Sequence, residues 1–114
     1  LDVSKIPQST VIPFISGCFL FCKSEILRKV KGMDGKFFLF MDDVDLSRRI
    51  NEVSKIYYNK NTSIKHTHGR IHTQSLYLTI VSIKSVIYYF NKYGWLFDSF
   101  RNKINDQIKK NILK

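Results

Sequence analysis

The most restrictive feature of the sequence is the run Phe37–Leu46, in which three phenylalanines lead directly into three carboxylates. The aromatic side chains need burial, whereas Asp42, Asp43 and Asp45 crowd like charges into four positions. Apolar residues then recur at helical spacing, which predicts a helix from Asp43 with carboxylates at its start, where the helix dipole favours negative charge. The sequence therefore predicts an acidic helix start directly after an aromatic run.

Two interpretations of the three carboxylates stay open on spacing alone. In the functional one, repulsion between neighbours makes at least one carboxylate a candidate proton acceptor, and the N–H groups of the helix start hold another ionised. In the structural one, Asp42 or Asp43 caps the helix, and Asp45 is a solvated acid of the first turn.

The charge distribution favours a functional site. The 114 residues carry a formal net charge of +10, which suits an anionic partner such as a phosphate-rich substrate, nucleic acid or acidic lipid headgroups. Five of the nine acidic residues nevertheless fall between Asp34 and Glu52, and a basic chain that concentrates its carboxylates is building a site. The size allows one domain. No apolar run reaches the ~18 residues of a membrane crossing, because Lys84 and Lys92 interrupt the longest one.

The remaining pattern predicts short strands and helices. Cys18 and Cys22 lie on one face of the first strand, too far apart to bridge, so we expect both to be buried apolar fillers in a reducing compartment. The expected elements are an irregular segment 1–13, a buried strand Phe14–Cys22, a helix capped by Ser24 and ending near Gly32, strands Ile56–Tyr58 and Ser63–His68, and two helices from about Ser75 to Leu113 broken around Gly94.

Two histidines lie at the end of the predicted strand Ser63–His68. His66 and His68 share one face of an extended chain, and His72 follows, so two imidazoles can reach one metal ion. Without a third ligand, however, the same pattern is more typical of hydrogen-bonded surface histidines.

Four blocks follow one another in the sequence: Ile15–Phe21, Lys31–Asp34, Phe37–Leu46 and Arg49. Taken in this order, they resemble the family 2 glycosyltransferases, and most closely their rhamnosyltransferase-like branch. Each block is short, and their order and spacing make the resemblance more specific than any one of them. It covers about Phe14 to Gly69, and Lys92-Tyr93-Gly94 resembles a further segment of the same branch.

The resemblance implies an α/β fold, the C-terminal, acceptor-side half of a GT-A type nucleotide-diphospho-sugar transferase fold. We expect a short mixed sheet with flanking helices and a helical C-terminal tail. Residues 1–74 would be the acceptor-side portion of the catalytic domain, and residues 75–114 a C-terminal helical extension. The Asp-x-Asp of the donor-binding half is absent, so the chain alone is expected to be inactive and to form a homo-oligomer through surface the other half would cover.

The resemblance also implies residue roles. Asp43 matches the catalytic base, Asp42 stands beside it on the acceptor side, and His66 matches a histidine that completes a donor-metal site in several members. The metal would be a divalent ion, Mg or Mn, in the intact enzyme, with none expected in this part by itself. Residues that support the motif are Gly17, Asp45 and Arg49. Departures from the pattern are Met33 for Phe, Asp42 for Glu, and Ile71 for Ser.

The implied activity is an inverting transfer of a sugar from a nucleotide-diphospho-sugar donor to a hydroxyl of a glycan or lipid-linked acceptor. The family context is bacterial surface polysaccharide synthesis, so we expect a cytoplasmic protein at the inner face of the membrane. The base would take the proton of the acceptor hydroxyl as its oxygen attacks the anomeric carbon.

Two non-catalytic alternatives follow from the composition. A nucleic-acid-binding module suits the excess of Lys and the interleaved Tyr and Phe, but the carboxylates would repel phosphates and the aromatics lie in apolar runs, so no nucleic acid is expected as a partner. A membrane-surface module suits an apolar stripe bordered by basic residues near the C-terminus. In the structural alternative, the stripe packs on its own domain or on a second copy of the chain. The stripe comprises Trp95, Leu96, Phe97, Phe100, Ile104, Ile108 and Ile112.

Overall fold

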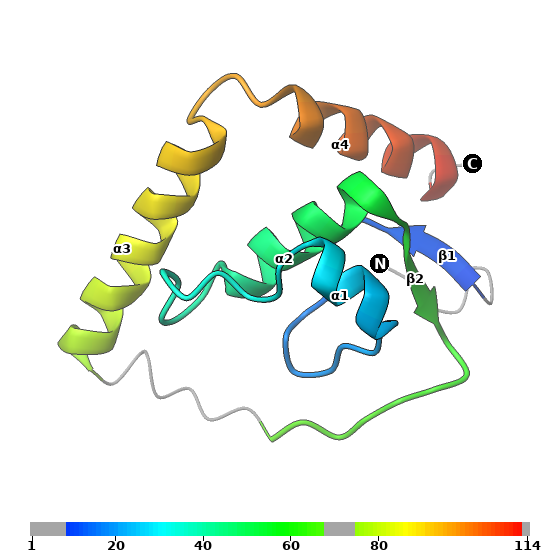
Figure 1. Cartoon of the computed structure of the whole chain (residues 1–114), viewed down its shortest axis with the longest axis horizontal. Coiled ribbons are helices and arrows are strands. Elements are labelled where there is room, and N and C mark those ends of the chain that lie inside the picture. The colour runs from blue at the N-terminus through cyan, green and yellow to red at the C-terminus, as the bar shows by residue number, and fades with distance from the viewer. Residues whose placement is uncertain (1–8, 68–74, 113–114) are drawn as a thin grey trace.

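The computed structural model describes residues 9–67 and 75–112, and in these ranges the chain forms four helices and one two-stranded sheet (Figure 1). The mixed α/β class predicted from the sequence is confirmed at this level. The elements are β1 (Ser9–Ile12), α1 (Ser24–Lys29), α2 (Asp42–Val53), β2 (Ile56–Asn59), α3 (Leu76–Tyr93) and α4 (Ser99–Ile112).

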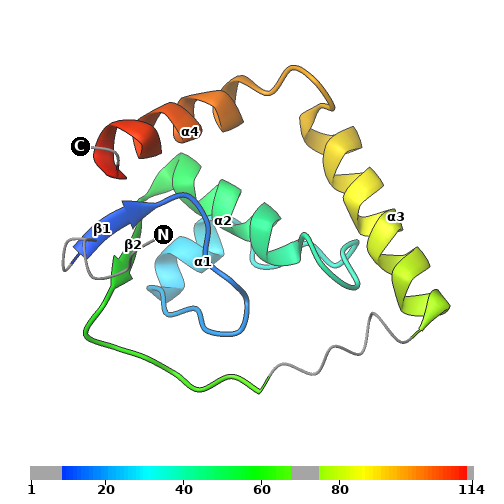
Figure 2. The ribbon, with the colours of Figure 1, turned by 180° about the vertical axis from the view of Figure 1, so that it is seen from behind.

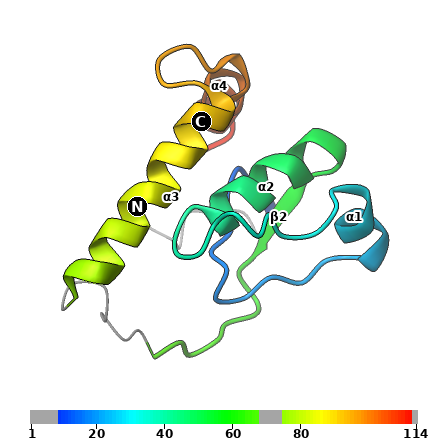
Figure 3. The ribbon, with the colours of Figure 1, turned by 60° about the vertical axis from the view of Figure 1, so that its left-hand side comes forward.

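Helix α2 lies at the centre of the arrangement. The sheet of β1 and β2 lies with α1 on one side of it, α3 stands on the other, and α4 runs back from the end of α3 along α2, as Figures 1 and 2 show from opposite sides. Figure 3 shows that α3 approaches the start of α2 along one side only, and its opposite side faces away from the rest of the chain. The two C-terminal helices therefore wrap around α2.

The predicted helices are confirmed. The break between α3 and α4 falls at Gly94, as predicted. Helix α1 begins at Ser24 itself, with Lys23 at the cap position and no side-chain cap bond, so the predicted capping role of Ser24 is wrong. The division at residues 74 and 75 stays a prediction, because residues 68–74 lie outside the described ranges.

The sheet differs from the prediction. Strands β1 and β2 pair antiparallel, from Ser9 opposite Asn59 to Ile12 opposite Ile56, so the predicted mixed sheet is wrong for the described residues. The irregular segment predicted over 1–13 is wrong at its end, because Thr10, Val11 and Ile12 are β-branched residues suited to a strand. Residues 63–67 are exposed and form no strand, which contradicts the predicted strand Ser63–His68 over these residues; His68 lies outside the described ranges.

The buried strand predicted over Phe14–Cys22 is wrong. This segment is a loop whose backbone bonds to α2 instead of to a strand: the Ile15 N–H donates to Ser47 Oγ at 3.2 Å, and the Gly17 N–H donates to Asp43 Oδ2 at 3.0 Å. A buried strand needs neighbouring strands for its backbone groups, and β1 has taken the place beside β2. Cys18 is consequently exposed and Cys22 half-buried, so the prediction that both are buried is also wrong.

The apolar core is small. Val30, Leu46, Ile50 and Ile56 are buried together where α1, α2 and β2 meet, with half-buried isoleucines packed around them. Among the described residues, the side chains that are almost completely enclosed are polar: Asp45 and Ser47, both on α2. Asp45 bonds to Lys92 and Tyr93 of α3, and Ser47 bonds to Ile15, so polar contacts hold α2 to α3 and to the loop after β1.

Gly94 ends α3 in a conformation that other residues rarely adopt. Its φ is 103°, and a Cβ added there would lie 3.0 Å from the Phe97 carbonyl oxygen. We expect Gly94→Ala to lower the free energy of unfolding by about 1–3 kcal/mol, measured by urea denaturation. Gly35→Ala is the matched control, since a Cβ there meets no atom within 4 Å. Equal stability of the two variants would contradict this prediction.

Candidate functional site

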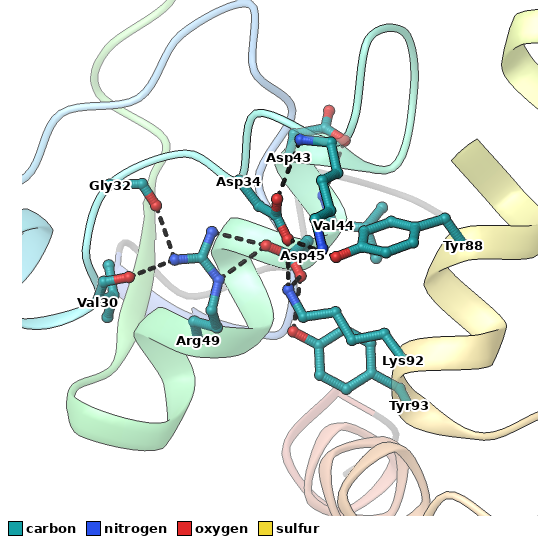
Figure 4. A network of polar contacts seen from close by, with 11 residues as sticks. Val30, Gly32, Asp34, Asp43, Val44, Asp45, Arg49, Tyr88, Lys92 and Tyr93 are labelled. Atoms are coloured by element: carbon teal, nitrogen blue, oxygen red, sulfur yellow. Dashed lines mark hydrogen bonds and ion pairs between the residues drawn. The ribbon is translucent and has the colours of Figure 1, made fainter. Parts of the chain in front are cut away.

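The candidate site is built around Asp45, in the first turn of α2. Its side chain is completely buried, at 0% exposure, although the sequence pattern allowed a solvated acid. Arg49 lies one helical turn further on, and its Nε donates to Asp45 Oδ2 at 2.8 Å. From the opposite side, Lys92 Nζ and the Tyr93 hydroxyl each donate to Asp45 Oδ1 at 2.7 Å (Figure 4). Both carboxylate oxygens are thus occupied by groups from two helices.

Arg49 carries the network on to the end of α1. Its Nη1 donates to the Gly32 carbonyl at 2.7 Å and also to the Val30 carbonyl. These carbonyls belong to the turn that closes α1, where the Gly32 N–H bonds back to the Leu27 oxygen. A planar guanidinium with several fixed donors can bridge a carboxylate and two carbonyls, which an ammonium cannot do with the same geometry. Arg49 thus links the first turn of α2 to the turn that closes α1.

Lys92 connects the network to a second carboxylate. Its Nζ lies 2.8 Å from Asp34 Oδ2, and the Tyr88 hydroxyl donates to the same oxygen at 3.1 Å. The hydrogen bond from Lys92 is the main reason that the pKa of Asp34 falls to about 2. Burial works to lower the pKa of Lys92, but its hydrogen bonds to Asp34 and Asp45 outweigh burial and raise it. Burial and the bond to Asp45 raise the pKa of Tyr93 to about 12.

Asp43 is half-buried beside this network and is held in direction by backbone groups. Its Oδ2 accepts the Gly17 N–H at 3.0 Å, and its Oδ1 accepts the N–H of Val44 at 2.8 Å. A Cβ at Gly17 would lie 3.4 Å from the Asp43 Cβ, so the absent side chain allows the loop to approach this closely. The structure therefore joins Gly17 and Asp43, two predicted site residues that lie 26 positions apart.

The backbone just before the acidic turn is strained. Phe40 and Met41 have φ values of 62° and 65°, in the left-handed region that costs a residue with a side chain about 1 kcal/mol or more. The strained pair turns the chain into α2, so that Asp42 and Asp43 fall in its first turn. Strain of this kind persists where the surroundings enforce it, and it is often found next to functional groups.

The remaining predicted site residues lie outside this cluster. Asp42 is half-buried at the first position of α2, and His66 lies on the exposed segment 60–67. Among residues 9–67 and 75–112, no three His, Cys, Asp or Glu side chains gather as a metal site. His68 and His72 are outside these ranges, so the metal role of His66 stays a prediction.

A separate ion pair fastens α4 to α2, and nothing in the sequence pattern indicated it. Arg48 Nη2 donates to Asp98 Oδ1 at 2.9 Å, and its guanidinium lies 3.9 Å from the ring centroid of Tyr93. Asp98 is 3% exposed and also accepts the N–H of Arg101 at the start of α4. The hydrogen bond from Arg48 lowers the pKa of Asp98 below its usual range. The pair fixes where α4 begins.

The network predicts a defined acid response. Because the pKa of Asp34 is lowered from 3.8 to about 2, this carboxylate stabilises the fold above about pH 4, and that contribution is lost as the pH falls toward 2. We expect the urea midpoint to decrease over this interval, and to decrease less in Asp34→Asn than in the unmodified chain. An identical pH dependence in the two proteins would show that the Asp34–Lys92 pair has no part in stability.

Comparison with protein-family models, with curated proteins and with solved structures gives no match. Among the described residues, no helix combines the length and apolar character needed to cross a bilayer.

Proposed function

We propose that the chain is the acceptor-side part of an inverting glycosyltransferase, in which Asp43 is the general base. The donor would be a nucleotide-diphospho-sugar, and the acceptor a hydroxyl of a glycan or a lipid-linked sugar. The observation that carries this proposal is the spatial convergence of sequence blocks that resemble the family.

Residues of three neighbouring blocks and of one segment 47 positions further along the chain meet at the start of α2. Asp34 and Gly32 come from the second block, Asp45 and Arg49 from the next two, and Lys92 from the segment near Gly94. Such a meeting is what a shared catalytic scaffold needs, because the network fixes the first turn of α2 without using Asp43. When the residues of a motif share one chemical task, they are expected to hold one another in position through contacts of this kind.

Asp43 has the properties of a positioned base. Each of its oxygens accepts one backbone N–H, which fixes the plane of the carboxylate, and the residue remains half-exposed. A carboxylate oxygen accepts more than one hydrogen bond, so both oxygens keep lone pairs for an acceptor hydroxyl. Asp45, by contrast, is enclosed and saturated by three cationic or hydroxyl partners, so its role is to position α2.

The step assigned to this chain is proton transfer at the acceptor. The acceptor hydroxyl loses its proton to a carboxylate oxygen of Asp43 while its oxygen forms the new bond to the anomeric carbon. The bond from that carbon to the diphosphate oxygen breaks with its electron pair, so the nucleoside diphosphate leaves and the configuration inverts.

The test is a transferase assay on a longer protein that contains this chain together with a donor-binding half. It would be incubated with a panel of nucleotide-diphospho-sugars and acceptor glycans, and release of nucleoside diphosphate would be measured. The 114-residue chain alone is the control, and we expect it to release none. Turnover by the chain alone, or no turnover of any donor by the longer protein, would contradict the proposal.

A further inference from the structure

Helix α3 has an inner face that is covered and an outer, apolar face that is largely exposed. The inner face packs toward α2 through Ser85 and Tyr89, both buried, and carries Lys92 of the polar network. The opposite face carries four exposed aliphatic residues at spacings of four, three and four, so that they form one line along the helix. We call this line the outer stripe; it comprises Leu76, Ile80, Ile83 and Ile87.

The loop between α3 and α4 begins about two helical turns beyond the last residue of the outer stripe. The Trp95 ring stacks on Phe90 with their centroids 5.1 Å apart, and its Nε1 donates to Asn91 Oδ1 at 2.9 Å, so the indole lies against the last turn of α3. The next two residues, Leu96 and Phe97, are 79% and 93% exposed. We call Trp95, Leu96 and Phe97 the tip loop.

The exposure of the tip loop is built into the fold. On one side the loop leaves α3 through Gly94, whose N–H bonds to the Phe90 carbonyl at 2.7 Å. On the other side it ends at Asp98, which is buried and doubly hydrogen-bonded to Arg48. Because both ends are fixed, Leu96 and Phe97 project from a defined position. The stripe predicted from the sequence is thus divided, since Phe100 and Ile104 pack inward whereas the tip loop does not.

The positive charge of the chain is concentrated in the part that carries these residues. From residue 53 to the end, the sequence has eleven Lys and Arg but only two acidic residues, and none between Glu52 and Asp98. Of these residues, Asp98 is paired with Arg48, and Lys92 is paired with Asp34 and Asp45. The outer stripe itself is bordered by Lys84, which is exposed. An apolar surface on a strongly basic half of a chain is complementary to anionic lipid headgroups over an acyl layer.

We propose that the outer stripe and the tip loop form a membrane-binding surface that takes anionic lipids. Helix α3 lies in the plane of the interface with its outer stripe in the headgroup region, and Leu96 and Phe97 insert beside it. Trp95 sits at the level where tryptophan side chains concentrate in bilayers. This inference is independent of the proposed transferase activity, and it concerns a face of α3 opposite to the one that meets the candidate site.

Two other partners fit the observations less well. A second copy of the chain would cover the outer stripe in an antiparallel helix pair, but it would bring together two chains that each carry a charge of +10. A nucleic acid would satisfy the charge and leave the aliphatic side chains uncovered. An anionic membrane accommodates both features at once.

The chain supplies its own reporter, because Trp95 is its single tryptophan. The full chain is mixed with vesicles of phosphatidylcholine alone or of phosphatidylcholine with phosphatidylglycerol, and binding is followed by sedimentation. Insertion is followed by the blue shift of Trp95 emission and its protection from acrylamide. We expect binding and a blue shift with the anionic vesicles, at least tenfold weaker binding to phosphatidylcholine alone, and weakening of the anionic binding by salt.

Variants test whether membrane binding depends on this surface or on exposed apolar side chains in general. Leu96→Ser with Phe97→Ser removes two exposed side chains and is expected to weaken binding at least tenfold while the far-ultraviolet circular dichroism stays unchanged. Phe21→Ser is the matched control: Phe21 is 89% exposed but lies in the loop before α1, and its loss is expected to leave binding within about twofold. Lys84→Glu is expected to weaken binding to anionic vesicles only.

Several outcomes would overturn the proposal. One is sedimentation without any change in Trp95 emission, and another is equal vesicle binding by the Leu96→Ser, Phe97→Ser variant and the unmodified chain. A stable dimer that fails to bind vesicles and is dissociated by Ile83→Glu would assign the outer stripe to a second copy. Retention on an oligonucleotide column at physiological salt, with no vesicle binding, would assign the charge to nucleic acid.

Discussion

Replacing Asp45 with alanine is expected to lower the free energy of unfolding by about 3–5 kcal/mol, the largest stability effect of any single substitution we predict. The carboxylate is completely buried and accepts bonds from Arg49, Lys92 and Tyr93. Alanine removes the negative charge that these partners share, and two cations then stand in a partly dehydrated site without it. A domain of this size has a total stability of about 5–15 kcal/mol, so the substitution would remove a large fraction of it.

The measurement is urea denaturation followed by circular dichroism, with Asp42→Ala as the matched control from the same turn of α2. Asp42 is half-buried, and its replacement is expected to cost no more than about 1 kcal/mol. Asp45→Asn keeps the shape and one acceptor oxygen, so it should fall between the two. Equal stabilities of Asp45→Ala and Asp42→Ala would mean that Asp45 is only a helix-start charge.

The role of Asp45 shows where sequence reasoning reached its limit. Spacing placed it correctly in the first turn of a helix, but the first turn has an exposed side and a buried side. Its burial depends on Lys92 and Tyr93, which lie 47 and 48 residues further along the chain. The resemblance includes Lys92-Tyr93-Gly94 as one of its segments. Nothing in the sequence, however, indicated that Lys92 and Tyr93 contact Asp45. The Arg48–Asp98 pair had no such signal, because neither residue belongs to a recurring pattern.

The local patterns succeeded where local forces decide the outcome. Helical periodicity and Gly94 were sufficient for α2, α3 and α4, since hydrogen bonds within a helix are made by neighbouring residues. Strands were predicted less well because a strand exists only with its partner. The apolar run Phe14–Cys22 has strand composition, but in the described residues β2 pairs with Ser9–Ile12 and the run bonds to α2 side chains instead.

The second large effect is expected at Asp43, in the longer protein proposed to have transferase activity. Asp43→Asn keeps the size of the side chain and one oxygen that can accept the Gly17 N–H, so the fold and the position of α2 should survive. The amide has no basic oxygen, however, and the acceptor hydroxyl must then attack while it still holds its proton. We expect kcat to fall by ~10²–10⁴-fold, the usual contribution of a general base.

The distribution of this loss between kinetic constants distinguishes a base from a structural carboxylate. If Asp43 acts only on the acceptor proton, the KM for the nucleotide-diphospho-sugar should stay within about threefold, because an interaction made only in the transition state lowers kcat and kcat/KM together. Glu52→Gln removes an exposed carboxylate about 13 Å further along the axis of α2 and is expected to leave kcat unchanged. A near-normal kcat in Asp43→Asn would sink the assignment of the base. A loss that tracks the urea midpoint of the variants would instead make Asp43 a second structural acid, joined to Gly17 to hold the loop in place.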